Sequence, residues 1–136
     1  MSKSKINKVS FGEIQEAFED IAESFKYKTK LIVGITRGGL VPAVMLSHKM
    51  NIRMKTVQIK LRASTEPLEL ELLRVYNSRD VLFIDDINDT GETIKLIQEY
   101  DQLANFATIQ KKKESIIRNA YYHKVVDGWI VYPWEL

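Results

Sequence analysis

The chain is 136 residues long, with 45% hydrophobic and 28% charged residues. This length suits one compact domain, and the composition is too apolar for a disordered chain. With 20 basic and 18 acidic residues the formal net charge is +2, so charge makes no case for a nucleic-acid partner. The absence of cysteine excludes disulfides, thiolate zinc sites and thiol catalysis.

The segment 1–10 is basic and polar and lacks the apolar core of a secretion signal. Elsewhere Gly, Thr, Arg or Asp interrupts each apolar stretch well before the roughly 20 residues that are needed to cross a bilayer. We therefore expect a cytoplasmic protein with no membrane partner.

A helix is predicted over residues 11–25. Ser10 and Glu13 have the spacing of a capping box, and apolar residues then recur at helical intervals. These residues are Ile14, Ala17, Phe18, Ile21, Ala22 and Phe25. We expect this apolar face to pack in the core and to carry no chemistry.

Two strands and a second helix are predicted next. Residues 31–36 are apolar and β-branched, which suits a strand buried on both faces. After a glycine-rich turn, residues 40–50 are predicted to be helical, with Pro42 in the first turn, where its missing N–H costs little. Residues 53–60 alternate well enough for a strand.

The charged stretch between residues 60 and 80 is predicted to be a mobile excursion from the sheet edge.

The second half continues the alternation of strands and helices. Strands are predicted over 81–84 and 106–110, with a helix from 92 to about 103. Such an order predicts an α/β fold with a mostly parallel central sheet and right-handed crossovers. Residues 121–136 are aromatic without a helical period, so we expect an extended flap over one end of the sheet.

Residues 81–93 join a strand to an acidic, hydroxyl-rich turn. Asp85 and Asp86 follow four apolar residues, and a Thr-Gly-x-Thr turn then opens the next helix. In open α/β sheets, ligands bind at this carboxyl edge. The hydroxyls of Thr90 and Thr93, with free backbone N–H groups at a helix amino terminus, would cradle a phosphate. The adjacent acids require hydroxyl donors or a hard cation such as Mg²⁺, and a sugar phosphate meets both demands.

This segment resembles the motif with which type I phosphoribosyltransferases bind phosphoribosyl pyrophosphate (PRPP). In that motif hydrophobic residues precede two acids, two variable residues and Asp-Thr-Gly-x-Thr. The resemblance implies the type I phosphoribosyltransferase fold, in which helices flank a mostly parallel sheet. It also implies one domain over residues 1–136, with a small C-terminal hood from about residue 111 to 136.

A second match lies upstream, in residues 34–43. Its Arg-Gly-Gly turn resembles the pyrophosphate loop of the 6-oxopurine group of that family, particularly the xanthine-guanine phosphoribosyltransferases. An arginine makes paired charge-assisted bonds to phosphate, and two glycines expose adjacent backbone donors. The resemblance implies a cis peptide between Thr36 and Arg37. The two motifs together imply these PRPP-binding residues: Arg37, Gly38, Gly39, Asp85, Asp86, Asp89, Thr90, Gly91, Glu92 and Thr93.

A third match covers residues 129–135 and resembles the hood of the same enzymes. There an aromatic ring stacks on the purine, and by position this residue is Trp129, followed by Ile130, whose backbone would meet the base edge. Glu135 is implied to lie near purine C2. Among three consecutive lysines, Lys112 best fits the family spacing and is implied to contact the exocyclic oxygen at purine C6. Because ammonium only donates, it favours an oxo group over the amino group of adenine.

The resemblance also implies a reaction. A purine ring nitrogen displaces pyrophosphate from C1 of PRPP, while positive charge develops on the sugar ring. Asp85 and Asp86 would hold the ribose hydroxyls, and Mg²⁺, helped by Asp86, would neutralise the leaving group together with Arg37. Asp89 would be the general base for the N7 proton. Because related enzymes are usually dimers or tetramers, we expect a homodimer or homotetramer.

The sequence departs from the family pattern in two places. Glu92 adds an anion at the variable position of the phosphate turn. Residues 59–62 lack the Ser-Tyr pair that many purine enzymes carry at the base of their closing loop, so exclusion of water is less secure. Lys60 or Arg62 is a candidate to grip pyrophosphate instead.

Two other functions fit parts of the sequence. A non-catalytic PRPP-sensing regulator could keep the same fold, since fold does not settle activity. The acid at position 89 and the absence of a DNA-binding helix pair oppose it. A phosphoryl-transfer enzyme with Asp85 as nucleophile leaves residues 129–135 unexplained. The sequence does not rank xanthine, guanine and hypoxanthine.

Overall fold

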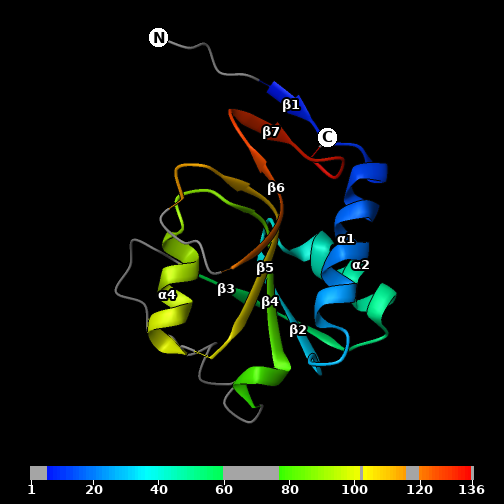
Figure 1. The fold of residues 1–136 in the computed structure, drawn as a ribbon, viewed down its shortest axis with the longest axis vertical. Helices are drawn as coiled ribbons and strands as arrows, with labels where there is room; N and C mark the ends of the chain where they lie inside the picture. The colour runs from blue at the N-terminus through cyan, green and yellow to red at the C-terminus, as the bar shows by residue number, and fades with distance from the viewer. Residues whose placement is uncertain (1–5, 60–76, 102, 116–119, 136) are drawn as a thin grey trace.

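The structure is a computed structural model that describes residues 6–59, 77–101, 103–115 and 120–135. The strands of its central sheet are β2 (Leu31–Thr36), β3 (Met54–Gln58), β4 (Val81–Asn88), β5 (Asn105–Lys112) and β6 (Tyr121–Val126). All pair in parallel, in the order β3-β2-β4-β5-β6. Helices α1 (Phe11–Phe25) and α2 (Leu40–Met50) cover one face, and α4 (Glu92–Tyr100) covers the other (Figure 1). The predicted α/β architecture is confirmed.

Helix α1 has the predicted bounds and the predicted buried face. Ser10 Oγ accepts a hydrogen bond from the backbone N–H of Glu13 at 3.2 Å, which satisfies one of the free donors of the first turn. The buried positions are Ile14, Ala17, Phe18, Ile21 and Phe25. They pack in one core with residues of α2, β4 and β5.

A second core lies on the opposite face of the sheet. Ile94 and Ile97 of α4 pack there against alternate residues of β2 and β4, among them Val33 and Phe83. The intervening residues of the same strands, such as Ile32, belong to the first core. Burial on both faces explains why β2 is apolar at every position before its last.

Two element boundaries differ from the prediction. Strand β4 continues past Ile84 to Asn88, because its ladder with β5 extends to the pair Asn88 and Lys111. Helix α4 ends at Tyr100 instead of about residue 103. The next residue, Asp101, is extended, and its Oδ1 accepts a hydrogen bond from the Leu103 backbone N–H at 3.1 Å.

The expectation of an extended flap over residues 121–136 is only partly right. Residues 121–126 form β6, the edge strand of the central sheet next to β5. After Gly128, which has a φ of 79°, β7 (Trp129–Val131) pairs in parallel with β1 (Ile6–Lys8). This two-stranded sheet lies beyond one end of the central sheet (Figure 1). Strand β1 was missed because its three residues show no alternation of apolar and polar side chains.

The predicted excursion after β3 falls mostly outside the described residues, as do Lys60 and Arg62. Its described end is the short 3₁₀ turn η2 (Ser78–Asp80), which leads into β4. Within the four described ranges, no helix combines the length and the apolar character that a membrane crossing requires.

Candidate active site

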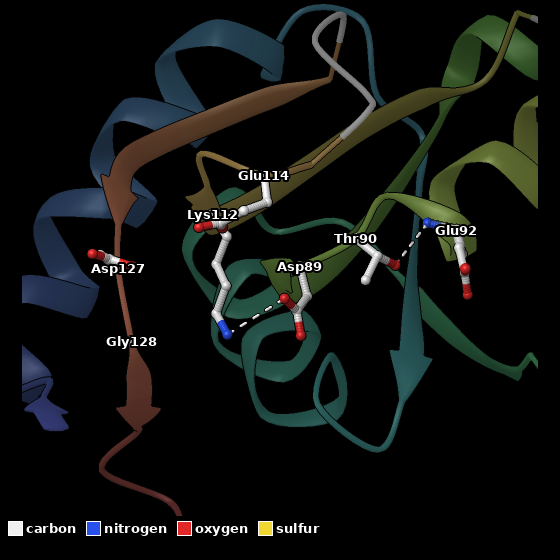
Figure 2. Close-up of a pocket in the computed structure, with 7 residues that line it drawn as sticks. All are labelled: Asp89, Thr90, Glu92, Lys112, Glu114, Asp127 and Gly128. Atoms are coloured by element: carbon white, nitrogen blue, oxygen red, sulfur yellow. Dashed lines mark hydrogen bonds and ion pairs between the residues drawn. The ribbon is translucent and has the colours of Figure 1, made fainter. Parts of the chain in front are cut away.

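Two adjoining pockets open at the carboxyl end of the central sheet. The first, of about 210 Å³, is lined by residues 85–94. The second, of about 480 Å³, is shown in Figure 2, and its lining is Asp89, Thr90, Glu92, Lys112, Glu114, Asp127 and Gly128. Asp89, Thr90 and Glu92 line both pockets, so the two form one continuous site.

The first pocket brings the predicted acid pair and the predicted phosphate turn together. Asp85 and Asp86 lie near the end of β4, and the turn from Asp89 to Thr93 leads into α4. Gly91 has a φ of 92°, a left-handed conformation that favours glycine at this helix start. Thr90 Oγ1 accepts a hydrogen bond from the Glu92 backbone N–H at 3.3 Å, which holds the turn in shape.

The acid pair is poorly solvated. Burial raises the pKa of the Asp85 carboxyl well above its usual range, and the neighbouring charge of Asp86 adds to the rise. Burial also raises the pKa of Asp86. Backbone donors hold both side chains, since Asp86 N–H donates to Asp85 Oδ1 at 2.8 Å and Ile87 N–H donates to Asp86 Oδ1 at 2.7 Å. A ligand that brings hydroxyl donors or a cation would therefore relieve an unfavourable buried charge.

The predicted pyrophosphate loop packs directly against Asp86. The peptide between Thr36 and Arg37 is cis, as the resemblance implied. A Cβ added at Gly38 would lie 2.6 Å from the carboxyl carbon and both oxygens of Asp86, and one added at Gly39 would overlap the carbonyl oxygen of Ile84. Only glycine lets this loop approach β4 so closely. The fold thus brings together the two predicted PRPP-binding segments, although they are far apart in sequence.

Gly38→Ala is expected to lower kcat/KM for PRPP by about 10- to 100-fold, since displacing a positioning loop by about 1 Å has effects of this size. The added methyl must push either the loop or the Asp86 carboxylate away. Gly12→Ala in α1 is the matched control, because a Cβ there meets only Ser10 Oγ at 3.7 Å. Steady-state kinetics with varied PRPP would measure both, and equal values for the two variants would contradict the packing role of Gly38.

The second pocket places Lys112 opposite Asp89. Lys112 Nζ lies 3.4 Å from Asp89 Oδ1, and Figure 2 shows the ammonium pointing to that carboxylate. Glu114, Asp127 and Gly128 also line this pocket and were not predicted. The Asp-Gly pair between two strands is a turn signal that could have drawn attention to the last two. No comparable signal exists for Glu114.

The three predicted base-binding residues of the C-terminal segment are absent from both pocket linings. The side chain of Trp129 is 64% exposed, while Ile130 is buried in the first core. Glu135 Oε1 accepts a hydrogen bond from the Tyr132 backbone N–H at 3.1 Å. Gly128, directly before Trp129, does line the second pocket.

Sequence reasoning also missed Tyr132, whose hydroxyl contacts the backbone of Asp86. Its buried hydroxyl lies 2.8 Å from Gln110 Oε1 and 3.3 Å from the carbonyl oxygen of Asp86. Burial, reinforced by the nearby Asp86 carboxylate, raises the pKa of Tyr132, so the hydroxyl stays protonated and donates. The ring stacks on Trp134 with centroids 5.1 Å apart. The C-terminal segment is thus hydrogen-bonded to the strand that carries the acids.

The side chains at this site supply only some of the ligands that Mg²⁺ needs. Asp85 and Asp86 offer the carboxylate oxygens that Mg²⁺ prefers. Within the described part of the chain, no group of three or more His, Cys, Asp or Glu side chains could hold a metal ion by itself. A magnesium ion here would need further oxygen ligands beyond these two side chains, from water or from a bound substrate.

Comparison with known proteins agrees with this geometry. A model of the phosphoribosyl transferase domain matches residues 4–136. Xanthine-guanine phosphoribosyltransferase from Chromohalobacter salexigens is 34% identical over 110 residues, which cover 77% of this chain and 68% of that protein. The enzyme of the same name from Cereibacter sphaeroides is 31% identical over 116 residues, with coverages of 79% and 70%. The crystal structure of a purine phosphoribosyltransferase from Pyrococcus horikoshii superposes with a TM-score of 0.76 at 27% identity, covering 96% of this chain and 94% of that one. The chain therefore belongs to the phosphoribosyltransferase family.

Proposed function

We propose that the protein is a purine phosphoribosyltransferase that converts guanine, xanthine or hypoxanthine and PRPP to the nucleoside 5'-monophosphate and pyrophosphate. The observation that carries the proposal is the continuous site. A partly buried acid pair and the turn that begins α4 meet in one pocket, and a lysine and a carboxylate face each other in the next. The names of the two bacterial relatives support a 6-oxopurine substrate.

In the proposed reaction, a purine nitrogen forms a bond to C1 of PRPP while the bond from C1 to pyrophosphate breaks. The electron pair of that bond leaves with pyrophosphate, and Asp89 accepts or relays the proton that the base loses. Asp85 and Asp86 would accept hydrogen bonds from the ribose hydroxyls and stabilise the positive charge that develops on the ring. Thr90, Thr93 and the backbone N–H of Gly91 would bind the 5-phosphate at the start of α4.

The pyrophosphate leaving group would be bound by the loop that follows β2. The backbone N–H of Gly38 and the exposed guanidinium of Arg37 would hold pyrophosphate. The N–H of Gly39, which was predicted as a second donor, already donates to the Ile35 carbonyl oxygen at 2.7 Å. Mg²⁺, when bound through PRPP oxygens and Asp86, would neutralise part of the pyrophosphate charge. The contact of Gly38 with the Asp86 carboxylate supports this arrangement, because it places the loop and the proposed metal ligand side by side.

Lys112 is proposed to recognise the oxygen at purine C6. Its side chain is 23% exposed and its ammonium already points into the second pocket. The base would also stack on Trp129 and meet the backbone of Ile130 and Glu135. For this the exposed Trp129 ring has to cover the pocket from its present position next to Gly128.

Lys112→Met is expected to lower kcat/KM for guanine and hypoxanthine by about 10- to 100-fold, the worth of one charge-assisted hydrogen bond. Binding of adenine should not be weakened in the same way, because adenine has no oxygen at C6. Lys95→Met is the matched control, because Lys95 is exposed on α4 and lines neither pocket. An equal loss in both variants would assign the effect to general charge instead of to contact with the base.

The decisive test of the function is incubation of the protein with PRPP, Mg²⁺ and each of the five common bases, followed by detection of nucleotide and pyrophosphate. Nucleotide from guanine, xanthine or hypoxanthine, and little from adenine or uracil, is the expected result. Binding of PRPP without any turnover would instead identify the PRPP-sensing regulator.

The protein is further proposed to act in the cytoplasm as a single-domain homodimer or homotetramer. Support for self-association comes from α2, where Leu40 and Val44 remain 43% and 40% exposed. Sedimentation equilibrium of the purified protein would measure the number of subunits, and a monomer at micromolar concentration would contradict the assembly.

A further inference from the structure

The proposed base-contacting lysine and the proposed general base lie on neighbouring strand ends. Strand β4 ends at Asn88 and β5 ends at Lys112, and Asn88 pairs in register with Lys111. Beyond these residues the chain enters two separate turns, one through Asp89 and one through residues 113–115. The distance between Lys112 and Asp89 therefore depends on how the two turns are joined.

A buried side-chain hydrogen bond joins them. Ser115 Oγ donates to Asn88 Oδ1 at 2.6 Å, and the two residues are only 4% and 3% exposed. The backbone N–H of Ser115 donates to the carbonyl oxygen of Lys112 at 3.1 Å, which closes the second turn. Asn88 directly precedes Asp89. This buried bond connects the turn of Lys112 with the turn of Asp89, whose side chains meet at 3.4 Å.

Because this hydrogen bond is buried, breaking it is costly. A hydrogen bond is stronger in a low-dielectric interior, and a buried acceptor that loses its donor pays a desolvation penalty. Two apolar side chains could fill the same space, but apolar contacts are not directional, so they would not fix the position of one turn relative to the other. A polar pair fixes one relative position.

We propose that Asn88 and Ser115 are a positioning pair that fixes Lys112 relative to Asp89 and thereby sets the affinity of the site for the purine base. The inference rests on the proposed function, in which Lys112 contacts the purine base and Asp89 accepts its proton. Ser115 lines neither pocket, so its effect has to pass through its partners. Asn88 does line the first pocket, which makes Ser115 the cleaner position to change.

The test is the steady-state kinetics of Ser115→Ala, with guanine and PRPP varied in turn. We expect KM for guanine to rise about tenfold, the effect of one lost buried hydrogen bond, and KM for PRPP to change less than about twofold. Ser115→Cys keeps the volume with a weaker donor and should fall between wild type and Ser115→Ala. Because the chain has no other cysteine, this variant cannot form an internal disulfide.

The matched control is Ser47→Ala. Ser47 Oγ donates to the carbonyl oxygen of Ile52 near the end of α2, away from both pockets, so the same chemical change should leave both KM values unaltered. If Ser115→Ala does not fold, the split between the two KM values in Ser115→Cys provides the same test.

An equal rise in both KM values, or lower stability with an unchanged KM for guanine, would overturn the positioning role. A wild-type protein that makes no nucleotide from any purine would overturn the proposed function and this inference with it. An active wild type with unaltered Ser115→Ala kinetics would overturn this inference alone.

Discussion

Asp89→Asn is expected to lower kcat by about 10²- to 10⁴-fold, the usual contribution of a general base. Asparagine cannot accept the proton of the purine, although it keeps the size of the side chain and an oxygen facing Lys112. Because the Asp89 side chain is 59% exposed, its replacement should cost little stability. The acid pair and the turn hydroxyls are untouched, so PRPP should still bind. Turnover of guanine and calorimetric binding of PRPP would measure the two effects separately.

Glu99→Gln is the control for this substitution. It removes one negative charge from the exposed surface of α4, the helix that begins in the same turn, without touching either pocket. Its kcat should equal that of the wild type. Full turnover by Asp89→Asn would show that the proton leaves by another route, for example directly to water.

Asp85→Asn is expected to weaken PRPP binding by about 10- to 100-fold and to stabilise the folded protein. Binding weakens because a carboxylate accepts hydrogen bonds from ribose hydroxyls more strongly than an amide does. Stability rises because Asp85 is partly buried beside Asp86, so that ionisation is unfavourable in the folded state. The amide oxygen can still accept the hydrogen bond that Asp86 N–H donates at 2.8 Å. A gain of about 1 kcal/mol would raise Tm by roughly 4 °C in a domain of this size.

The stabilisation should depend on pH with a defined sign. The pKa of Asp85 is raised in the folded state above the ordinary value of 3.8, so between these two values the folded protein binds more protons than the unfolded chain. The contribution of Asp85 to the free energy of unfolding therefore falls as pH rises through that window. Asp85→Asn removes this contribution, and the Tm of the variant should exceed that of the wild type by more as pH rises from about 4.

Thermal unfolding of both proteins at a series of pH values would measure this difference. Asp101→Asn, at the far end of α4, controls for the loss of one carboxylate. A Tm difference that stays constant with pH would contradict a raised pKa of Asp85 in the folded state. A gain in stability without loss of PRPP affinity would instead show that the acid pair does not bind the ribose.

Local patterns in the sequence were sufficient to predict much of the fold and part of the site. Helix α1 and strand β2 were predicted with their observed bounds, because capping and apolar periodicity act within a few residues. The acid pair and the phosphate turn were also predicted as one unit. They occupy a contiguous segment at the end of β4, so their proximity follows from the chain itself.

The elements that were mispredicted depend on distant partners. Strand β1 exists because it pairs with β7, more than a hundred residues later, and its own residues carry no strand pattern. Strand β6 was expected to be part of a flap, but β5 offered an open edge for pairing. Strand β4 continues beyond its apolar residues because its ladder with β5 extends to Asn88. Hydrogen-bond ladders between strands are long-range interactions that override local propensity.

The sequence by itself determined most of the residues that are proposed to carry the chemistry, since residue type and spacing are local properties. Only the tertiary structure decided how these residues meet. The approach of Gly38 to Asp86, the contact between Lys112 and Asp89, and the support of Asp86 by Tyr132 each join segments that are far apart in the chain. Strand order and register set those distances, and both follow from packing of the whole sheet between its two layers of helices.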